Sequence, residues 1–540
     1  MGQELLNISN LSVRLPASGE RTFAIEDVSL SLSRNEILCV VGESGSGKSI
    51  MAKTVMGLLP KRLTVAGGEI VYEGAELLKI SEPAWRAMRG QAMAMIFQEP
   101  MSALNPLNTI GDQIEEVVKV HTRHKKPERR NMVLEILEAV RLPDPRKIVH
   151  AYPHELSGGQ RQRAMIAMAL ILKPDLLIAD EPTTALDVTT QAGILDLVKE
   201  IQAERSTGVL FITHDIGVVA EIADNVVVMK DGRIVEHGTT EEILRRPRRD
   251  YTRMLISAVP SLKTVRRDPT GAVREDALKI ENLVKTFRTG GLLSGTREVK
   301  AVSDVSLSVR RGETLGIVGE SGSGKSTLAR CVIRLVDPDS GRILFDGHDI
   351  AVLSRSKMLP LRSRIQMIFQ DPYGSLNPRL TVAKMVAQGP MLHGTPADDA
   401  KARALELLKL VGLDESAANR YPHEFSGGQR QRIGIARALA LQPEILVADE
   451  PVSALDVSVQ AQVLRLLADI REKFHLTMIF ITHDLRVAAQ VCDTVAVMQL
   501  GKVVEFGATH DVFTAPKHSY TQKLLASIPG KDWDFALEDA

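Results

Sequence analysis

The same eight-letter segment occurs once in each half of the chain, and this repeat restricts the fold more than any other feature. Its letters are GESGSGKS at residues 42–49 and again at 319–326, which match the pattern G-x-x-x-x-G-K-[ST]. Such a loop joins a buried strand to a helix, because its glycines let backbone N–H groups surround a phosphate at the helix N-terminus. Apolar runs precede both loops and helix-like segments follow them. Each half therefore predicts a P-loop nucleotide-binding domain.

Composition is typical of a globular protein with more than one core. A chain of 540 residues is too long for a single core, and 44% hydrophobic with 25% charged residues is ordinary for folded domains. Lys and Arg total 67, as do Asp and Glu, so the net charge of +0 gives no general attraction to nucleic acid or an anionic membrane. The sequence shows no apolar stretch of roughly 20 residues and no signal peptide. We therefore expect a cytosolic protein that meets a membrane only through a partner.

Three cysteines lie far apart, without the C-x-x-C spacing of a metal or redox site; they are Cys39, Cys331 and Cys492. Isolated cysteines of this kind are commonly small buried hydrophobic residues. We interpret them as reduced core residues.

The second half repeats the first motif by motif, and differences in length fall between motifs. Both halves contain a middle section with helical spacing, at 110–120 and 132–140 and again at 382–392 and 402–411. Apolar runs rich in β-branched residues flank these sections and predict a mostly parallel sheet. We expect an α/β protein of two tandem RecA-like P-loop domains, each with an antiparallel β portion and a helical subdomain. The predicted boundaries are 1–260, a linker at 261–277, and 278–540, with a C-terminal extension in each domain.

Apolar strands in both halves end in a pair of carboxylates, Asp180-Glu181 and Asp449-Glu450. The carboxyl ends of parallel strands meet at one edge of a sheet, so both pairs are expected beside the P-loops. The aspartate of each pair suits coordination of Mg²⁺, and the glutamate is placed to polarise the water that attacks the γ-phosphate.

One glutamine and one histidine in each half also follow apolar strands. They are Gln98 and His214 in the first half and Gln370 and His483 in the second. The glutamines are candidates for sensing Mg²⁺ and the attacking water. A lone histidine at a strand end is commonly structural. Its recurrence in both halves, at the edge where the γ-phosphate must lie, favours a phosphate contact.

A second helix start suited to an anion occurs in each half, with the letters LSGGQ at 156–160 and FSGGQ at 425–429. Together with the P-loop, the glutamine, the Asp-Glu pair and the histidine, in this order, the segment resembles the ATP-binding subunits of ABC transporters. The resemblance covers nearly the whole chain, twice, and this signature is highly specific to that superfamily.

The resemblance implies that the two copies pair head to tail and bind ATP with Mg²⁺ between the P-loop of one copy and the signature of the other. The first site would consist of Gly42, Glu43, Ser44, Gly45, Ser46, Gly47, Lys48 and Ser49, with Gln98, Asp180, Glu181 and His214, and with Ser426, Gly428 and Gln429. The second would consist of Gly319, Glu320, Ser321, Gly322, Ser323, Gly324, Lys325, Ser326 and Thr327, with Gln370, Asp449, Glu450 and His483, and with Ser157, Gly159 and Gln160. Mg²⁺ would be held by Ser49, Gln98 and Asp180 in one site and by Ser326, Gln370 and Asp449 in the other. Asp187 and Asp456 would lie between the sites.

The two copies differ at the residue expected to stack on adenine. Members of the family usually carry an aromatic residue there, upstream of the P-loop. Phe23 matches this in the first copy, whereas Lys300 holds the aligned position in the second and Phe287 is a weak substitute. We therefore expect the two sites to be unequal.

Further segments resemble the group of importers for dipeptides, oligopeptides, nickel and glutathione, namely 97–106 and 369–378, Tyr152 to Glu155 and Tyr421 to Glu424, and the ends after Tyr251 and Tyr520. Many members of this group carry cysteines after this tyrosine that hold an iron–sulfur cluster. This chain has no cysteine in either extension, so no cluster is predicted.

The resemblance implies an ATPase at the cytoplasmic face of the inner membrane, held there by two transmembrane permease subunits that receive solute from an extracytoplasmic binding protein. The permeases would dock in a groove beside Gln98 and Gln370. The alternative is a soluble tandem ABC ATPase that acts on ribosomes or DNA. Such proteins usually carry a long basic linker, zinc-binding cysteines or a coiled coil, and the basic runs 121–130 and 245–249 are more typical of solvated faces. Tandem sugar importers usually have a degraded second P-loop, unlike this chain, and nucleic acid is not an expected partner.

Overall fold

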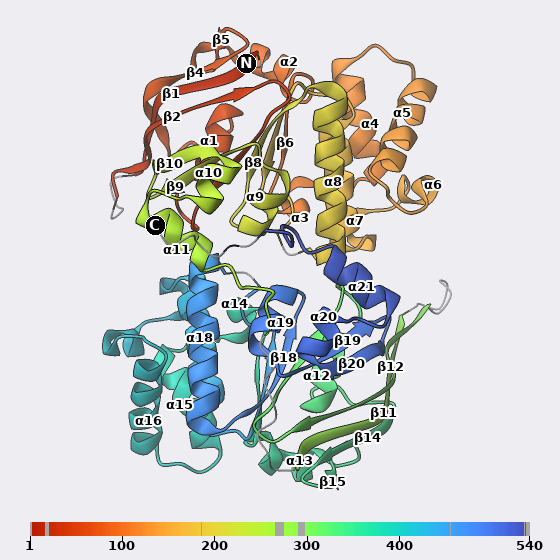
Figure 1. Cartoon of the computed structure of the whole chain (residues 1–540), viewed down its shortest axis with the longest axis vertical. Helices are drawn as coiled ribbons and strands as arrows, with labels where there is room; N and C mark the ends of the chain where they lie inside the picture. Colours follow the sequence, from red (N-terminus) through yellow and green to blue (C-terminus); the bar gives the residue numbers. More distant parts are fainter. Residues whose placement is uncertain are drawn as a thin grey trace. The chain divides into compact units, whose positions relative to one another are not determined.

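The computed structural model describes residues 3–16, 21–184, 186–264, 275–289, 297–453, 455–533 and 535. The chain divides into two units (Figure 1). Unit 1 contains residues 1–186, 190–259 and 529–540, and unit 2 contains residues 187–189 and 260–528. Residues 265–274 of the predicted linker lie outside the described part of the chain, as do Ala185 and Ala454.

Unit 1 is built from two sheets. The antiparallel sheet has the strand order β2 (Phe23–Ser33), β1 (Glu4–Arg14), β4 (Thr64–Tyr72) and β5 (Ala75–Glu76). The larger sheet has the order β10 (Arg233–Thr239), β9 (Asn225–Lys230), β3 (Ile37–Val41), β8 (Gly208–Ile212), β7 (Leu176–Asp180) and β6 (Met93–Ile96). Its strands pair in parallel except for β10, which is antiparallel to β9. The sheet is therefore mostly parallel, as the sequence predicts.

The helical section of unit 1 lies on the opposite side from strands β1, β2, β4 and β5 in Figure 1. It contains α3 (Pro100–Ala103), α4 (Ile110–His121), α5 (Lys126–Ala139), α6 (Pro145–Ile148), the 3₁₀ turn η2 (Pro153–Glu155) and α7 (Gly158–Leu170). The other helices are α1 (Lys48–Val55), η1 (Leu77–Lys79), α2 (Glu82–Met88), α8 (Val188–Arg205), α9 (Ile216–Ile222), α10 (Thr240–Arg245) and α11 (Asp250–Ser257).

Local sequence explains the ends of the two long helices in this section. Thr109 begins α4, because its hydroxyl accepts the Asp112 N–H at 3.2 Å, and Ile110, Ile114 and Val118 then form one buried face. Helix α5 begins earlier than the apolar spacing at 132–140 predicts. The Glu128 carboxylate accepts the N–H of Lys125 at 2.8 Å and caps this polar first turn, which hydrophobic periodicity cannot reveal.

Unit 2 repeats this order of strands. Its antiparallel sheet runs β12 (Arg297–Arg310), β11 (Asp276–Thr289), β14 (Ser340–Phe345) and β15 (His348–Asp349). Its larger sheet runs β16 (Ile365–Ile368), β17 (Ile445–Asp449), β18 (Thr477–Thr482), β13 (Thr314–Val318), β19 (Thr494–Gln499) and β20 (Lys502–Ala508). The fold class predicted from the sequence is confirmed in both units.

The helices of unit 2 follow the same plan. They are α12 (Lys325–Val332), α13 (Arg355–Arg362), α14 (Pro372–Ser375), α15 (Val382–Leu392), α16 (Ala397–Leu410), α17 (Gly427–Leu439), α18 (Val457–Phe474), α19 (Leu485–Val491), α20 (Thr509–Thr514) and α21 (Ser519–Ala526), with the 3₁₀ turns η3 (Glu415–Asn419) and η4 (Pro422–Glu424). Helix α15 has the predicted bounds, and α16 begins before the predicted 402.

The larger sheet divides the core of unit 1 into two layers, because alternate residues of its strands face opposite sides. Cys39, Leu177 and Phe211 pack with the helical section, while Leu38, Ile178 and Leu210 pack with the antiparallel sheet. All three cysteines of the chain are free and buried, as the sequence predicts, and burial raises the pKa of the Cys39 thiol. These buried strands deliver their last residues to one edge of the sheet.

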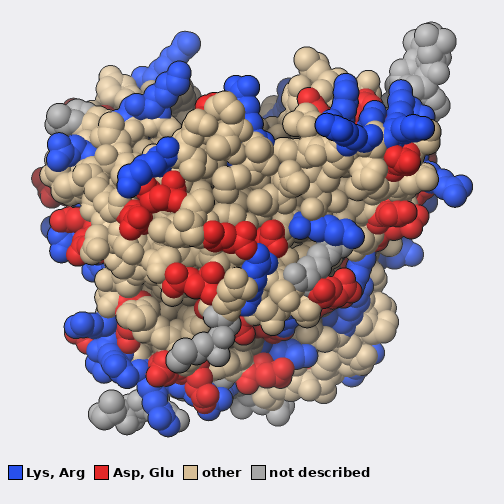
Figure 2. Space-filling model, turned by 90° about the horizontal axis from the view of Figure 1, so that it is seen from above, with Lys and Arg blue, Asp and Glu red and all other residues tan. Residues whose placement is uncertain are grey.

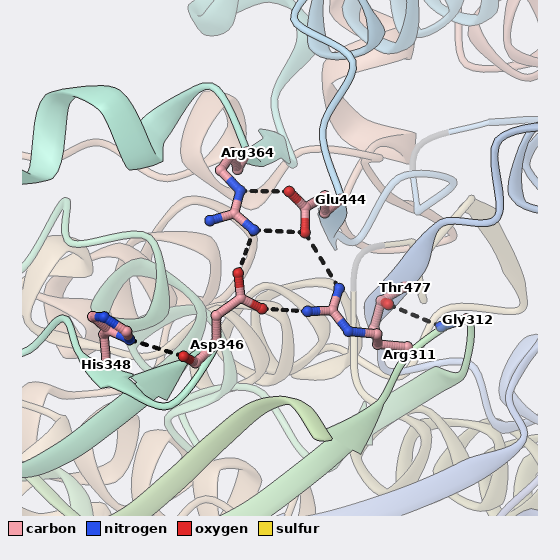
Figure 3. A network of polar contacts seen from close by, with 7 residues as sticks. All are labelled: Arg311, Gly312, Asp346, His348, Arg364, Glu444 and Thr477. Atoms are coloured by element: carbon pink, nitrogen blue, oxygen red, sulfur yellow. Dashed lines mark hydrogen bonds and ion pairs between the residues drawn. The ribbon is translucent and has the colours of Figure 1, made fainter. Parts of the chain in front are cut away.

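A charged network in unit 2 holds the antiparallel sheet against the opposite edge of the parallel sheet (Figure 3). Arg364, just before β16, donates to Glu444 at 2.8 Å and also pairs with Asp346 in the β14–β15 turn. Arg311, between β12 and β13, contacts Glu444 at 3.3 Å and completes the ring with Asp346. Two arginines shared by two carboxylates join four segments of the chain.

Candidate active site

Each P-loop is held in shape by glycines that no other residue could replace without strain. In unit 1 the loop connects β3 to α1, and Gly47 has φ 102° at the start of the helix. Gly42 has φ 150°, and a Cβ placed on it would lie 2.1 Å from the carbonyl oxygen of Met229. The loop therefore has a positive φ and a close backbone approach at the same positions.

The lysine of each P-loop is buried and is bound by the loop's own carbonyl groups. Lys48 is 4% exposed and donates to the oxygens of Gly42 at 2.7 Å and Glu43 at 2.9 Å. Lys325 donates to Gly319 and Glu320 at 2.7 and 2.8 Å. Burial lowers the pKa of Lys325. A buried ammonium group needs acceptors, and here the loop supplies them.

The residues after the two lysines meet the predicted magnesium aspartates. The Ser49 hydroxyl donates to Asp180 at 2.8 Å, and the Ser326 hydroxyl donates to Asp449 at 2.9 Å. Both carboxyl groups are almost fully buried, and burial raises the pKa of each aspartate. Hydroxyl and carboxylate oxygens are ligands that Mg²⁺ prefers, and a bound cation would offset the cost of burying the charge. These residues therefore fit a magnesium ion.

Glu181 collects three polar neighbours around one carboxylate oxygen. Gln98 donates to it at 2.9 Å, Thr184 donates at 3.0 Å, and the Nδ1 atom of His214 lies 3.4 Å away. Burial alone would raise the pKa of this carboxyl group, but the contact and charge of His214, together with the charge of Lys48 and the Thr184 hydrogen bond, outweigh it and lower the pKa to about 2. Glu181 is therefore ionised at neutral pH.

Glu450 has the same arrangement in unit 2. Gln370 donates to it at 2.9 Å, and Nδ1 of His483 lies 3.2 Å from the same oxygen. Burial would lower the pKa of His483, but the Glu450 carboxylate outweighs it and raises that pKa. Burial alone would raise the pKa of Glu450, but the contact and charge of His483, together with Lys325 and Ser453, outweigh it and lower that pKa.

Both glutamates have a strained backbone, with φ 48° at Glu181 and 45° at Glu450. A left-handed conformation is uncommon for such a residue and is found preferentially at functional sites. The backbone N–H groups bond to Ile212 and Ile481, both at 3.0 Å, and so fix this turn at the strand end. The structure thus brings the predicted lysine, serine, aspartate, glutamate, glutamine and histidine of each half to one edge of its sheet.

The two signatures begin helices, as the sequence predicts. Ser157 caps α7, because its hydroxyl accepts the Gln160 N–H at 3.3 Å and the Gln160 side chain accepts the Ser157 N–H at 2.9 Å. Ser426 and Gln429 cap α17 in the same way, at 3.3 and 3.0 Å. Gly159 approaches Thr190, and Gly428 approaches Val459, too closely for a further side chain. Both serines therefore stand at a rigid helix N-terminus, and their role towards nucleotide stays a prediction.

Strand register shows which residues lie opposite Phe23 and Lys300, while their role towards adenine stays a prediction. Phe23 pairs with Arg14 across the antiparallel sheet of unit 1, with the guanidinium 5.7 Å from the ring centre. Lys300 pairs with Thr286 at the corresponding place in unit 2. Phe287 pairs instead with Val299, one step further along the strands, where its side chain points to the other face. The weak substitute at Phe287 therefore does not occupy the position of Phe23.

Sequence reasoning missed two kinds of contact with the P-loops. Arg21 donates to the carbonyl of Gly45 at 3.1 Å and pairs with Asp231 at 3.2 Å. Tyr251 and Tyr520, in the C-terminal extensions, accept the backbone N–H groups of Glu43 and Glu320. Both tyrosines are followed by a threonine, and this repeated pair marks them in the sequence. The sequence does not show that each tyrosine contacts a P-loop.

Unit 2 has a groove beside Gln370. It has a volume of about 780 Å³ and is lined by apolar and basic residues, among them Phe369, Met385, Leu392, Arg330, Arg362 and Arg437. Gln370 and Asp449 also line it, so the groove reaches the predicted magnesium residues. A segment bound in this groove would touch the residue that contacts Glu450.

Comparison with known families finds two matches along the chain. The ABC transporter family matches residues 25–184 and 302–453, which include both P-loops and both Asp-Glu pairs. The C-terminal region of oligopeptide/dipeptide transporters matches residues 235–285 and 504–535, which include Tyr251 and Tyr520.

Among similar proteins is the glutathione import ATP-binding protein GsiA of Escherichia coli (strain K12), which is 47% identical over 97% of this chain and 89% of its own length. The protein of the same name from Salmonella choleraesuis (strain SC-B67) is 46% identical over 98% of this chain and 90% of its own. The solved dimeric ATP-binding cassette MJ0796 bound to ADP and Pi is 32% identical, covers 43% of this chain and 98% of its own, and has a TM-score of 0.40.

Proposed function

Because the chain belongs to the family of ABC transporter ATP-binding subunits, in the dipeptide and oligopeptide importer branch, we propose that it hydrolyses ATP to drive import of a small peptide-like solute. One observation carries the proposal. Each unit places the P-loop lysine, a serine–aspartate pair and a glutamate–glutamine–histidine cluster at one sheet edge. These are the groups that phosphoryl transfer from ATP to water requires.

The residues of the cluster divide the chemical work. The ammonium groups of Lys48 and Lys325, which the loop carbonyls hold in place, would also reach the β- and γ-phosphates of ATP. Mg²⁺, when bound, neutralises phosphate charge, and the Ser-Asp pairs, together with Gln98 and Gln370, would hold it. Each ionised glutamate accepts a hydrogen bond from the attacking water, while its glutamine and histidine neighbours hold the carboxylate oriented.

We propose that ATP binds between the P-loop of one domain and the signature of the other. Two observations support it: both signatures start rigid helices that can donate to an anion, and both P-loops are complete. The domains would run over 1–260 and 278–540 with 261–277 as linker. Closure on ATP and release after hydrolysis would be the mechanical output.

We propose that this chain binds two permease subunits at the cytoplasmic face of the inner membrane. A solute-binding protein outside the membrane would deliver the solute to these permeases. The groove beside Gln370 supports this, because a permease helix seated there would touch the site that positions water. None of the helices in the described residues is both long and apolar enough to cross a bilayer.

Action on nucleic acid has less support. On the face drawn in Figure 2, acidic and basic side chains are interspersed. Within the basic run 121–130, Arg129 pairs with Glu115 at 2.9 Å and His124 pairs with Glu128 at 3.3 Å. A polyanion partner usually requires a coherent basic surface.

The relatives are named for glutathione import, so we propose glutathione or a similar short peptide as the solute. The test deletes the gene and measures ATP-dependent uptake of labelled glutathione and of a dipeptide. Uptake of one of them is expected to disappear and to return with the wild-type gene, but not with Lys48→Ala and Lys325→Ala combined. Unchanged uptake of both solutes, together with cosedimentation with ribosomes at moderate salt, would contradict the proposal.

The difference at the adenine-stacking position gives a further prediction. Phe23→Ala is expected to raise the dissociation constant for ATP at one class of site about fivefold, because it removes an aromatic stack worth about 1 kcal/mol. Lys300→Phe is expected to tighten the other class of site. Titration with a fluorescent ATP analogue measures both. The prediction is contradicted if the two sites of the wild type bind ATP equally well and neither substitution changes that affinity.

A further inference from the structure

One tyrosine from each C-terminal extension reaches the first peptide of a P-loop. Tyr251 in α11 accepts the Glu43 N–H at 3.2 Å in unit 1. Tyr520 in α21 accepts the Glu320 N–H at 3.1 Å in unit 2. The two contacts occur independently in the two units, and they join residues that are 208 and 200 positions apart in sequence.

The other end of the same peptide group is bound by the P-loop lysine. The carbonyl of Gly42 accepts from Lys48 at 2.7 Å, and the next N–H, that of Glu43, is the one that Tyr251 accepts. In unit 2 the carbonyl of Gly319 accepts from Lys325 at 2.7 Å, and Tyr520 accepts the next N–H. A peptide group is planar, so fixing its N–H also fixes the direction of its carbonyl.

The residue before this peptide is a glycine, which sets few limits on the orientation of the peptide. The preceding glycine has φ 150° in unit 1 and 148° in unit 2, a region that costs glycine little. The tyrosine bond to the N–H and the lysine bond to the carbonyl therefore hold this peptide in one orientation together.

The tyrosine rings are themselves held firmly. Tyr251 is 8% and Tyr520 is 6% exposed, and both belong to the main hydrophobic core of their unit. The ammonium of Lys230 lies 4.8 Å from the ring centre of Tyr251. Burial raises the pKa of both phenols, so each hydroxyl is neutral at physiological pH and keeps its proton.

We propose that Tyr251 and Tyr520 are positioning residues of the two ATP sites. Each fixes the first peptide of its P-loop, and through that peptide the place of the lysine that receives the phosphates. The C-terminal extension of each domain is thus part of the ATP site. This inference rests on ATP binding at the P-loops and does not depend on which solute is imported.

The test uses Tyr251→Phe and Tyr520→Phe, singly and together, in the full chain. Phenylalanine keeps the ring and removes only the hydroxyl. The dissociation constant for MgATP at the altered site is expected to rise about fivefold, because the loop N–H loses its acceptor. In unit 1 the change also removes the bond that the Tyr251 hydroxyl donates to the Glu43 carboxylate at 3.4 Å. Competition by AMP is expected to be unchanged, because AMP carries neither of the phosphates that the lysine reaches.

Tyr72→Phe is the matched control. Tyr72 lies on β4 of the antiparallel sheet, is 3% exposed and donates a hydrogen bond to the carbonyl of Ala92, just before β6, at 3.3 Å. It is expected to change the melting temperature about as much as the other variants, with ATP affinity unchanged. The proposal is overturned if Tyr251→Phe and Tyr520→Phe leave ATP affinity unchanged, or if they weaken AMP as much as ATP. Failure of the wild type to bind ATP would instead refute the proposed function.

Discussion

Glu181→Gln and Glu450→Gln, made singly, are each expected to lower steady-state ATP hydrolysis about 100-fold or more. The change removes the charge that attracts the proton of the attacking water, and such a group contributes at least that factor. Glutamine has nearly the same shape, so ATP binding is expected to persist. Release of phosphate measures hydrolysis, and retention of labelled ATP measures binding.

The pH dependence of ATP hydrolysis is a second test of the role of Glu181. The pKa of Glu181 is lowered to about 2, so this carboxylate stays ionised from neutral pH down to well below pH 5. A loss of activity between pH 8 and pH 5 is therefore not expected to come from its protonation. Glu69→Gln, which changes an exposed carboxylate on β4, is the control and should hydrolyse ATP at the wild-type rate. A normal rate in either catalytic variant would show that its site is not needed.

The sequence alone predicted the groups that this experiment changes, because a simple physical rule places them. Asp180 and Glu181 end a buried strand, and the P-loop follows another strand of the same sheet. Since parallel strands deliver their carboxyl ends to one edge, the contact between Ser49 and Asp180, 131 positions apart, could be expected. The same pattern occurs in the second half, so a chance match does not explain it.

Contacts that depend on side-chain packing could not be predicted in this way. No spacing rule links Tyr251 to Glu43, because the contact requires α11 to pack beside the P-loop. The network of Figure 3 is a second case. Arg364 stands just before β16, whereas Ala92 holds the same place before β6. The corresponding network of unit 1 therefore contains one arginine, Arg34, which pairs with Asp175 and Glu73. Such differences between repeats follow from three-dimensional neighbours rather than from motifs.

Gly324→Ala is expected to destabilise unit 2 by about 3 kcal/mol or more and to reduce its ATP hydrolysis about 100-fold. Gly324 has φ 105°, and a Cβ on it would lie 2.0 Å from the carbonyl oxygen of Ala301. Neither the strain nor the clash can be relieved by a rotating side chain, because both involve backbone. The loop must therefore move, and Lys325 and Ser326, which follow directly, must move with it. Urea denaturation and phosphate release measure the two effects.

Gly434→Ala provides a control of opposite sign. Gly434 lies within α17, and a Cβ on it would meet no atom within 4 Å. Alanine in a helix interior is favoured over glycine by about 1 kcal/mol, so this variant is expected to be slightly more stable than the wild type, with unchanged hydrolysis. Gly47→Ala, whose Cβ would lie 2.7 Å from the Ala24 oxygen, should have an effect between the two. If Gly324→Ala instead folds and hydrolyses ATP as Gly434→Ala does, the close backbone approach does not set the shape of the P-loop.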